Sequence, residues 1–549
     1  MMDRKRLLRR LEELCNVPSV SETAGETAMP GVLLKMLNEN GYFHEHPEAA
    51  RILPVPEDPY RRGFVCALMR CGGRSNNTVI LLSHFDVVGV AGYGAQAEYA
   101  FRPEAYTESL RKSGGARLPE DAAADLAAGG WLFGRGVMDM KFGIAADLEV
   151  LEEAGGHPDL LDGNLLFLSV PDEEASSRGM LAAVGYLLRL KEEQGLRYTC
   201  CLVTEPFFPK YPGDRGKYLY HGTIGKLLPA FFCVGKETHA CEPFSGVNPN
   251  LLTARIIERL DSNPDFCDAA DGVSTPPPVC LKASDCKDAY SVQTPLAAYA
   301  YFNFMTLSKT PGEVMEQMKS VAREAFADVL RDMREKAERF SLCGGKPALP
   351  AFRPRILTWG ELLAACEKAN GQTFSRHIRT FVRERLDSGK AAPDLRRLSI
   401  DTVREAFRFY PDQEPAVVVF FCPPFYPHAL QQADSVAVKL CRHTAELAKT
   451  KYGEKLAVEP VFPGLSDMSY LGLSQPCDCG GMGRLFPLWN NGYRLPLDEI
   501  AELSVPFLNI GPYGKDAHKS TERLCVPYSL QTTAPLILDA VRWLLRPEE

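Results

Sequence analysis

The sequence predicts an α/β fold in which a mixed sheet flanked by helices carries a smaller, inserted α+β domain. Short apolar runs such as 78–83 (TVILLS) and 164–170 (NLLFLSV) are each followed by polar residues and a helix-like stretch, for example 143–154. Continuous apolar strands that alternate with helices are typical of parallel strands buried on both faces. After residue 210 the order becomes strand, helix, strand, helix, which is typical of a small α+β domain.

These patterns divide the chain into four parts. Residues 1–212 are expected to form the first part of the large domain, and residues 213–340 the inserted domain. Residues 341–414 are a helix-rich insertion that we expect to be attached to the inserted domain. The apolar run 416–421 (AVVVFF) is expected to return the chain to the large sheet. The second part of the large domain is therefore predicted to be 415–549.

Composition excludes several classes of protein. The chain has 549 residues, with 24% charged and 45% hydrophobic residues, which is an ordinary globular balance. Lys plus Arg number 62 and Asp plus Glu number 70, so the formal net charge is −8. A negative net charge disfavours a general binder of nucleic acid or of anionic membranes. We therefore expect neither nucleic acid nor a membrane as a partner.

The N-terminus and the cysteines indicate a cytoplasmic protein. Residues 1–20 alternate basic and apolar residues at helical spacing, which predicts an amphipathic helix rather than a signal peptide. The sequence contains no uncharged apolar stretch of about 18 residues, the length that a membrane span requires. The 17 cysteines lie scattered in apolar segments without paired spacing, which favours reduced thiols over a disulfide framework.

Polar clusters follow several predicted strands. His84 and Asp86 stand at the end of the run LLSHFDVV, and Asp139 lies in the glycine-containing segment GRGVMDMK just before a predicted helix. Open α/β sheets bind ligands at the carboxyl ends of their strands. Taken alone, the His-x-Asp pair is also typical of a structural histidine, and Asp139 of a helix N-cap.

Three further segments also place a carboxylate or a histidine after a predicted strand. Glu173 and Glu174 follow a strand in PDEE, Glu205 follows the next strand in VTEP, and His518 lies in the late segment GPYGKDAHKSTE. Adjacent glutamates alone would indicate only a solvated helix start. Because all five segments fall at one edge of the predicted sheet, together they predict a metal site.

Charge balance supports two divalent ions and a general base. Carboxylates about 4 Å apart repel by roughly 4 kcal/mol at an effective dielectric near 20, so a cation is needed to hold them together. Asp139, Glu174, Glu205 and one hydroxide would offset four positive charges, which leaves Glu173 to take a proton from water. Imidazole with carboxylate favours zinc, although cobalt or manganese would also fit. Asp86 is expected to accept the other ring N–H of His84.

In this order the motifs resemble the zinc-dependent amidohydrolase and metallopeptidase family of aminoacylases, glutamate carboxypeptidases and succinyl-diaminopimelate desuccinylases. The segments HFDVV, PDEE and HGTIGK are most similar to arginine-utilisation proteins of the RocB type. The resemblance implies a zinc-peptidase-like sheet and a ferredoxin-like lid domain that forms a homodimer. It also implies roles for the site residues: one metal on His84 and Glu205, the other on Glu174 and His518, Asp139 bridging, and Glu173 as base.

The same resemblance implies that the lid lends a histidine to the active site of its partner. His239, in the segment 235–249, is the candidate. We expect a hydrolase that cleaves an amide bond in a peptide or an N-acyl amino acid, with arginine catabolism implied by the subgroup. Two alternatives stay open: a metal-retaining binding or regulatory protein without turnover, and a two-metal phosphoesterase. The latter needs cationic groups for phosphoryl oxygens, and the metal motifs contain only Arg135 and Lys141.

Overall fold

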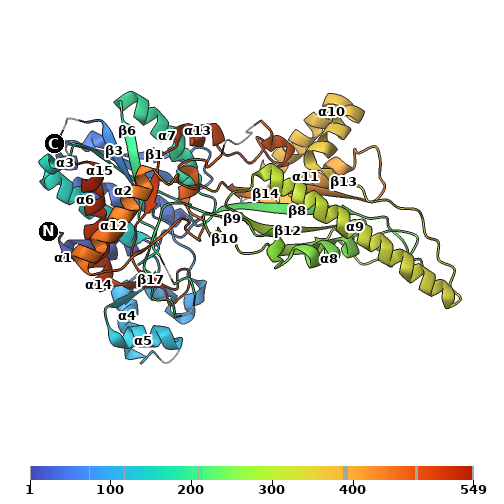
Figure 1. The fold of residues 1–549 in the computed structure, drawn as a ribbon, viewed down its shortest axis with the longest axis horizontal. Helices are drawn as coiled ribbons and strands as arrows, with labels where there is room; N and C mark the ends of the chain where they lie inside the picture. The colour runs from blue at the N-terminus through green and yellow to red at the C-terminus, as the bar shows by residue number, and fades with distance from the viewer. Residues whose placement is uncertain are drawn as a thin grey trace. The chain divides into compact units, whose positions relative to one another are not determined.

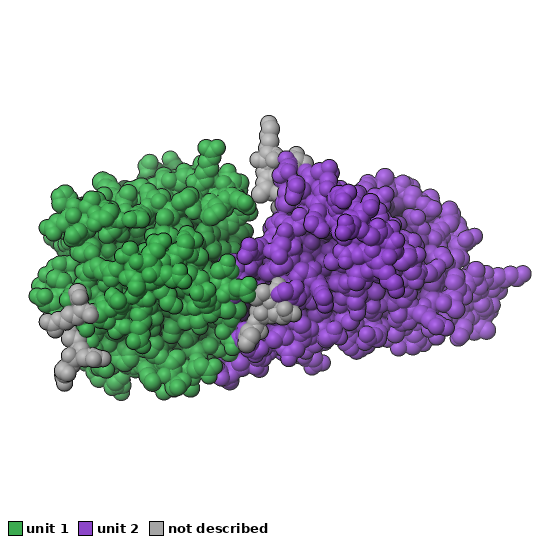
Figure 2. Space-filling model, turned by 90° about the horizontal axis from the view of Figure 1, so that it is seen from above, with its two compact units in different colours: residues 1–223, 429–474, 498–549 green, residues 224–428, 475–497 purple. Residues whose placement is uncertain are grey.

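The computed structural model describes residues 2–72, 75–115, 118–207, 209–211, 213–387, 394–475 and 480–546. The chain divides into two compact units, shown in different colours in Figure 2. Unit 1 comprises residues 1–223, 429–474 and 498–549, and unit 2 comprises residues 224–428 and 475–497. Each unit has its own sheet, so each is described separately.

Unit 1 is built on an eight-stranded mixed sheet with the order β1-β2-β5-β3-β6-β16-β7-β15 (Figure 1). The strands are β1 (Ala50–Pro54), β2 (Gly63–Cys71), β3 (Asn77–His84), β5 (Gly163–Val170), β6 (Arg197–Val203), β7 (Tyr218–Tyr220), β15 (Ala457–Glu459) and β16 (Phe507–Asn509). The neighbours β5, β3, β6 and β16 run parallel, whereas β1 and β2 are antiparallel additions. The predicted α/β class is confirmed.

Helices cover both faces of this sheet. The helices of unit 1 are α1 (Arg4–Cys15), α2 (Met29–Asn38), α3 (Gly41–Glu45), α4 (Pro103–Lys112), α5 (Glu120–Ala128), α6 (Lys141–Gly156), α7 (Arg178–Gln194), α12 (Val436–Tyr452), α13 (Leu497–Leu503, which begins at the last residue of unit 2), α14 (Val526–Tyr528) and α15 (Ala534–Leu544). Side chains of α1, α6 and α15 belong to one core cluster with Leu81 and Phe167, and on the opposite face Tyr186 of α7 packs against Phe64. All eight residues of β5 are therefore buried.

A small three-stranded sheet of β17 (Gly514–Lys515), β18 (Arg523–Cys525) and β4 (Trp131–Phe133) completes unit 1. It pairs the segment before Asp139 with the segment after His518, because β4 is hydrogen-bonded to β18. These two distant parts of the sequence are therefore held side by side.

Unit 2 contains a five-stranded sheet with the order β11-β12-β8-β14-β13 (Figure 1). Its elements are β8 (Gly225–Val234), α8 (Pro249–Leu260), β9 (Ala269–Ala270), β10 (Val273–Ser274), β11 (Val279–Asp285), β12 (Ala297–Thr306), α9 (Pro311–Leu342), β13 (Ile356–Thr358), α10 (Trp359–Asp387), α11 (Leu395–Phe407) and β14 (Ala416–Tyr426). The order β8-α8-β11-β12-α9-β14 is a ferredoxin-like βαββαβ arrangement. Helices α10 and α11 pack on the face of the sheet that carries Phe232 and Val418.

The expectation that 416–421 returns to the large sheet is wrong. These residues lie in β14, which pairs antiparallel with β8 in unit 2, and unit 1 resumes only at Ala429. A fully apolar run is buried equally well in either sheet, so its sequence did not distinguish between them.

The described residues contain no helix that is long and apolar enough to cross a membrane. The fifteen described cysteines are free, and most of them are buried.

The two units should differ in their response to a core truncation in unit 1. Phe167→Ala removes a fully buried ring from β5, and such a truncation costs about 3–5 kcal/mol because it leaves a cavity. Amide hydrogen exchange measured by mass spectrometry should show faster exchange in β3 and β5, with β8 of unit 2 unchanged. Leu342→Ala, at an exposed position, is the control and should change neither. Equal acceleration in both sheets would contradict separate units.

Candidate metal centre

The site residues of unit 1 come from the ends of neighbouring parallel strands. His84 is the last residue of β3, and the turn 171–174 follows β5. Glu205 lies just beyond β6, and His518 lies after β16, in the loop between β17 and β18. Because β5, β3, β6 and β16 are consecutive in the sheet, their carboxyl ends meet at one edge. The structure therefore brings these predicted residues together.

Asp139, just before α6, lies between two histidines. Its Oδ1 is 3.3 Å from His84 Nε2, and its Oδ2 is 3.2 Å from His518 Nε2. Glu205 Oε1 is 3.5 Å from His84 Nε2, and Glu174 Oε2 is 3.0 Å from His518 Nε2. Each histidine thus faces one oxygen of Asp139 and one further carboxylate.

The donor atoms fit a metal ion. Two groups have ligand atoms that all lie within 4.8 Å of one another: one of His84, Asp139 and Glu174, the other of His84, Glu173 and Glu205. His84 is buried, yet its Nε2 has no well-aligned hydrogen-bond partner among the described residues. A buried nitrogen left without a partner is costly unless a ligand binds it. Imidazole nitrogen with carboxylate oxygen is a set that zinc accepts.

Burial and mutual repulsion act on these carboxylates. Burial, followed by the charge of Asp139, raises the pKa of Glu174 to about 7. Hydrogen bonds with Asp139 and Glu174 raise the pKa of His518 to about 10. Both pKa shifts reflect a high density of acidic groups, which disfavours ionisation of a carboxyl and favours the protonated form of a histidine.

Glu173 occupies a different position from the other carboxylates. Its Oε2 lies 3.9 Å from His84 Nε2, which is farther than the nearest oxygens of Asp139 and Glu205. Burial raises the pKa of its carboxyl well above the usual range. Its place beside the ligand atoms, slightly farther from His84 than the other carboxylates, is where a general base would be needed.

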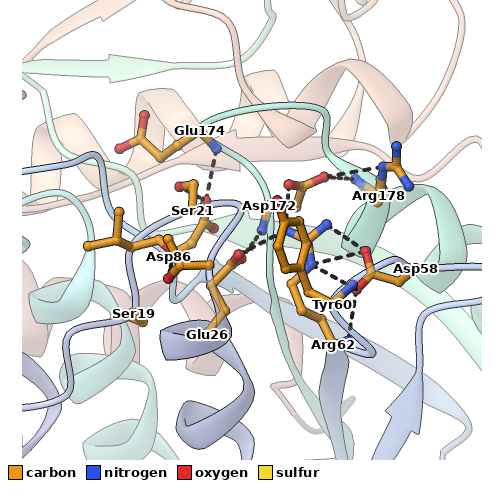
Figure 3. Close-up of polar contacts among 12 residues, drawn as sticks. Ser19, Ser21, Glu26, Asp58, Tyr60, Arg62, Asp86, Asp172, Glu174 and Arg178 are labelled. Carbon is orange, nitrogen blue, oxygen red and sulfur yellow. Dashed lines mark hydrogen bonds and ion pairs between the residues drawn. The ribbon is translucent and has the colours of Figure 1, made fainter. Parts of the chain in front are cut away.

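Asp86 supports the cluster from behind. It is fully buried, and its Oδ1 lies 3.4 Å from His84 Nδ1. Its two oxygens accept the backbone N–H groups of Glu173 and Glu174, both at 3.1 Å, and Oδ2 also accepts the Ser21 hydroxyl at 2.7 Å (Figure 3). Asp86 therefore orients the His84 ring and fixes the turn that carries both glutamates.

Arg135 and Glu522 join two loops of the site, a role that sequence reasoning missed. They form a buried ion pair, and Arg135 also donates to the carbonyl of His518 at 3.1 Å. Glu522 in turn accepts the backbone N–H of Met138 at 3.4 Å. Both residues lie inside motifs that the sequence singled out, but their pairing across the chain carried no local signal.

Asp467, in the segment 464–470 (GLSDMSY), is a further buried carboxylate that the sequence analysis did not predict. Burial raises its pKa to about 8, and the charges of Asp86 and Glu205 act in the same direction. The crowding of acidic side chains around His84 therefore extends to Asp467.

His239 lies in unit 2 and is not one of the residues gathered in unit 1. Its ring is exposed, and Nδ1 accepts the backbone N–H of Cys241 at 3.1 Å. The residue forms an antiparallel bridge with Gln293.

Comparisons with known proteins identify the family to which the chain belongs. Residues 117–487 match the model of peptidase family M20/M25/M40. The chain is 37% identical to the uncharacterized protein YqjN of Bacillus subtilis, covering 99% of this chain and 97% of that protein. It is 32% identical to protein RocB of Bacillus subtilis, covering 97% and 94%. A succinyl-diaminopimelate desuccinylase of Cereibacter sphaeroides is 30% identical over 174 residues, 31% of this chain and 42% of that enzyme.

Two solved structures show the same fold at low identity. A tripeptidase from Staphylococcus aureus aligns with a TM-score of 0.54 at 15% identity, covering 100% of both chains. Aminopeptidase PepT from Bacillus cereus aligns with a TM-score of 0.55 at 14% identity, covering 99% of both. Together with the match that spans most of the sequence, these likenesses show that the chain belongs to peptidase family M20/M25/M40 and is an enzyme of the hydrolase class.

Proposed function

We propose that the protein is a metal-dependent hydrolase that cleaves an amide bond in a peptide or an N-acyl amino acid. The observation that carries this proposal is the position of Asp139, whose two oxygens face His84 and His518 separately. This geometry suits a carboxylate that bridges two ions. His84 and Glu205 would hold one ion, Glu174 and His518 the other, with zinc the preferred metal and cobalt or manganese also compatible.

The ions would polarise the scissile carbonyl and acidify the attacking water. The protein's own residues would do the rest. Glu173 would take the proton from that water and deliver it to the nitrogen of the leaving amine. Asp86 would keep Nε2 of His84 directed at the ligand cluster, because its carboxylate and its carbonyl both face Nδ1.

Two observations favour this function over the alternatives. A phosphoesterase would need Arg135 and Lys141 for phosphoryl oxygens, but Arg135 is paired with Glu522. The Lys141 ammonium donates to the carbonyls of Leu14 and Val17 at 3.1 and 2.8 Å. A binding protein without turnover would have no use for a base, yet Glu173 stands beside the ligand cluster with a raised pKa.

The chain is similar to RocB over nearly its whole length. From the resemblance to RocB-type proteins we propose a role in amino-acid catabolism, specifically of arginine. The cysteines in the described part of the chain are free and mostly buried, which supports a cytoplasmic location. We also propose that unit 2 acts as a lid and forms a homodimer. Its edge strand β11 carries exposed Val279 and Leu281, and the nearby segment exposes Tyr290 and Val292. His239 forms an antiparallel bridge with Gln293 of that segment. This position is compatible with a histidine that contributes to the active site of a partner chain.

Metal analysis tests the proposed centre directly. Protein purified without chelator should contain about two equivalents of divalent metal per chain, because two sets of ligands flank Asp139. Chelation should abolish hydrolysis in a panel of dipeptides and N-acyl amino acids, and zinc should restore it. His84→Ala and His518→Ala should each lower the metal content. Full turnover by metal-free protein would refute the mechanism.

Glu173→Gln separates the base from the ligands. The substitution keeps the shape of the side chain but removes its affinity for a proton, so kcat should fall at least ~100-fold. Metal content should stay near two equivalents, whereas Glu205→Gln, a matched change at a proposed ligand, should lower it. Normal turnover by Glu173→Gln would show that another group is the base.

Subunit mixing tests the lid and His239. His239→Ala should lose about 100- to 1,000-fold in kcat while it keeps its metal, since removal of an oxyanion donor has this effect. Mixed with Glu173→Gln under confirmed subunit exchange, it should regain activity, because one hybrid site holds both groups. Leu281→Glu on the edge strand should yield monomers in light scattering. If mixing restored nothing, His239 would act within its own chain or not at all.

A further inference from the structure

The three consecutive acidic residues of the turn 172–174 differ in their surroundings. Glu173 and Glu174 lie at the metal cluster, whereas Asp172 is fully buried and contacts a different set of groups. Its Oδ1 accepts Arg62 Nη1 at 2.6 Å, and its Oδ2 accepts the backbone N–H of Arg178 at 3.2 Å. The Asp172 carboxylate thus belongs to a second polar cluster beside the metal centre (Figure 3).

The backbone of Asp172 is also constrained. Its φ of 72° lies in the left-handed region, which costs energy for a residue other than glycine. Its carbonyl accepts the N–H groups of Ser176 and Ser177 at 3.0 and 2.6 Å, and its own N–H donates to Glu26 Oε1 at 3.1 Å. Such a conformation persists only where the surroundings determine it.

Arg62 connects three segments at this point. Its guanidinium, almost completely buried, donates through Nη1 to Glu26 and Asp172 at 2.8 and 2.6 Å, and through Nη2 to Asp58 at 2.6 Å (Figure 3). Glu26 belongs to the short 3-10 helix Ala24–Ala28, close in sequence to Ser21, which donates to Asp86. One planar guanidinium therefore satisfies three buried carboxylates at fixed angles, which a lysine ammonium cannot do.

We propose that Arg62 is a positioning residue for the metal centre: through Asp172 it fixes the turn that places Glu173 and Glu174 opposite His84. This inference rests on the proposed function. It follows that Arg62 controls the proposed metal site made by Glu174 and His518, because Glu174 lies in this turn. Arg62 also controls the position of the proposed base, Glu173. The half made by His84 and Glu205 lies on β3 and beyond β6, which Arg62 does not contact in the described structure.

The test compares Arg62→Lys with Arg10→Lys. Arg10 is an equally buried arginine that pairs with Glu149 and Glu152 between α1 and α6, away from the turn. Zinc titration by calorimetry should show one of the two sites weakened about 10- to 100-fold in Arg62→Lys, the range typical of groups behind metal ligands, and the other changed less than threefold. kcat should fall with KM nearly unchanged. Arg10→Lys should keep both sites and kcat.

Asp172→Asn supplies a second variant in case Arg62→Lys does not fold. Asparagine tolerates a left-handed φ and keeps one acceptor, but it lacks the charge that Arg62 binds. Asp172→Asn should therefore weaken the same single metal site as Arg62→Lys. Hydrogen exchange of residues 171–178 in metal-free protein should be faster in both variants and unchanged in Arg10→Lys.

The outcomes separate the two proposals. If the wild-type protein bound fewer than two metal ions, the proposed centre would be refuted. Hydrogen exchange of residues 171–178 would still show whether Arg62 stabilises the turn. Equal weakening of both sites, or unchanged exchange at 171–178, would overturn the positioning role of Arg62.

Discussion

The crowding of negative charge at one edge of the large sheet is the constraint on which the site depends. Asp86, Asp139, Glu173, Glu174, Glu205 and Asp467 are all buried or nearly so around two histidines. Buried carboxylates repel strongly in a low dielectric, and a fold that collects them needs compensating positive charge. Divalent cations provide that charge in a small volume. We therefore propose that metal binding stabilises this arrangement and that hydrolysis uses it.

A second layer of polar contacts holds this arrangement in place. Asp86 links the end of β3 to the turn after β5, and the pair of Arg135 and Glu522 links the segment before α6 to the loop of His518. Arg62 holds the same turn from the other side. Each contact joins segments that are far apart in sequence, so the geometry of the ligands depends on the completed fold of unit 1.

The sequence was sufficient to predict the α/β class and the proximity of the proposed ligands. Apolar strands and the polar residues that follow them are local signals. It was not sufficient for β14, whose apolar run suits either sheet. Nor did it indicate the ion pairs of Arg62 and Arg135 or the burial of Asp467, since all three depend on which distant segments meet. The role of His239 stays a prediction, because it concerns a second chain.

The most direct test of the account is anomalous diffraction at the zinc absorption edge from crystals of metal-loaded protein. The account predicts two peaks about 3.5–4 Å apart, the spacing typical of two-metal sites, with Asp139 between them. One peak should lie beside His84 and Glu205, the other beside Glu174 and His518. A single peak, or peaks away from Asp139, would contradict the account.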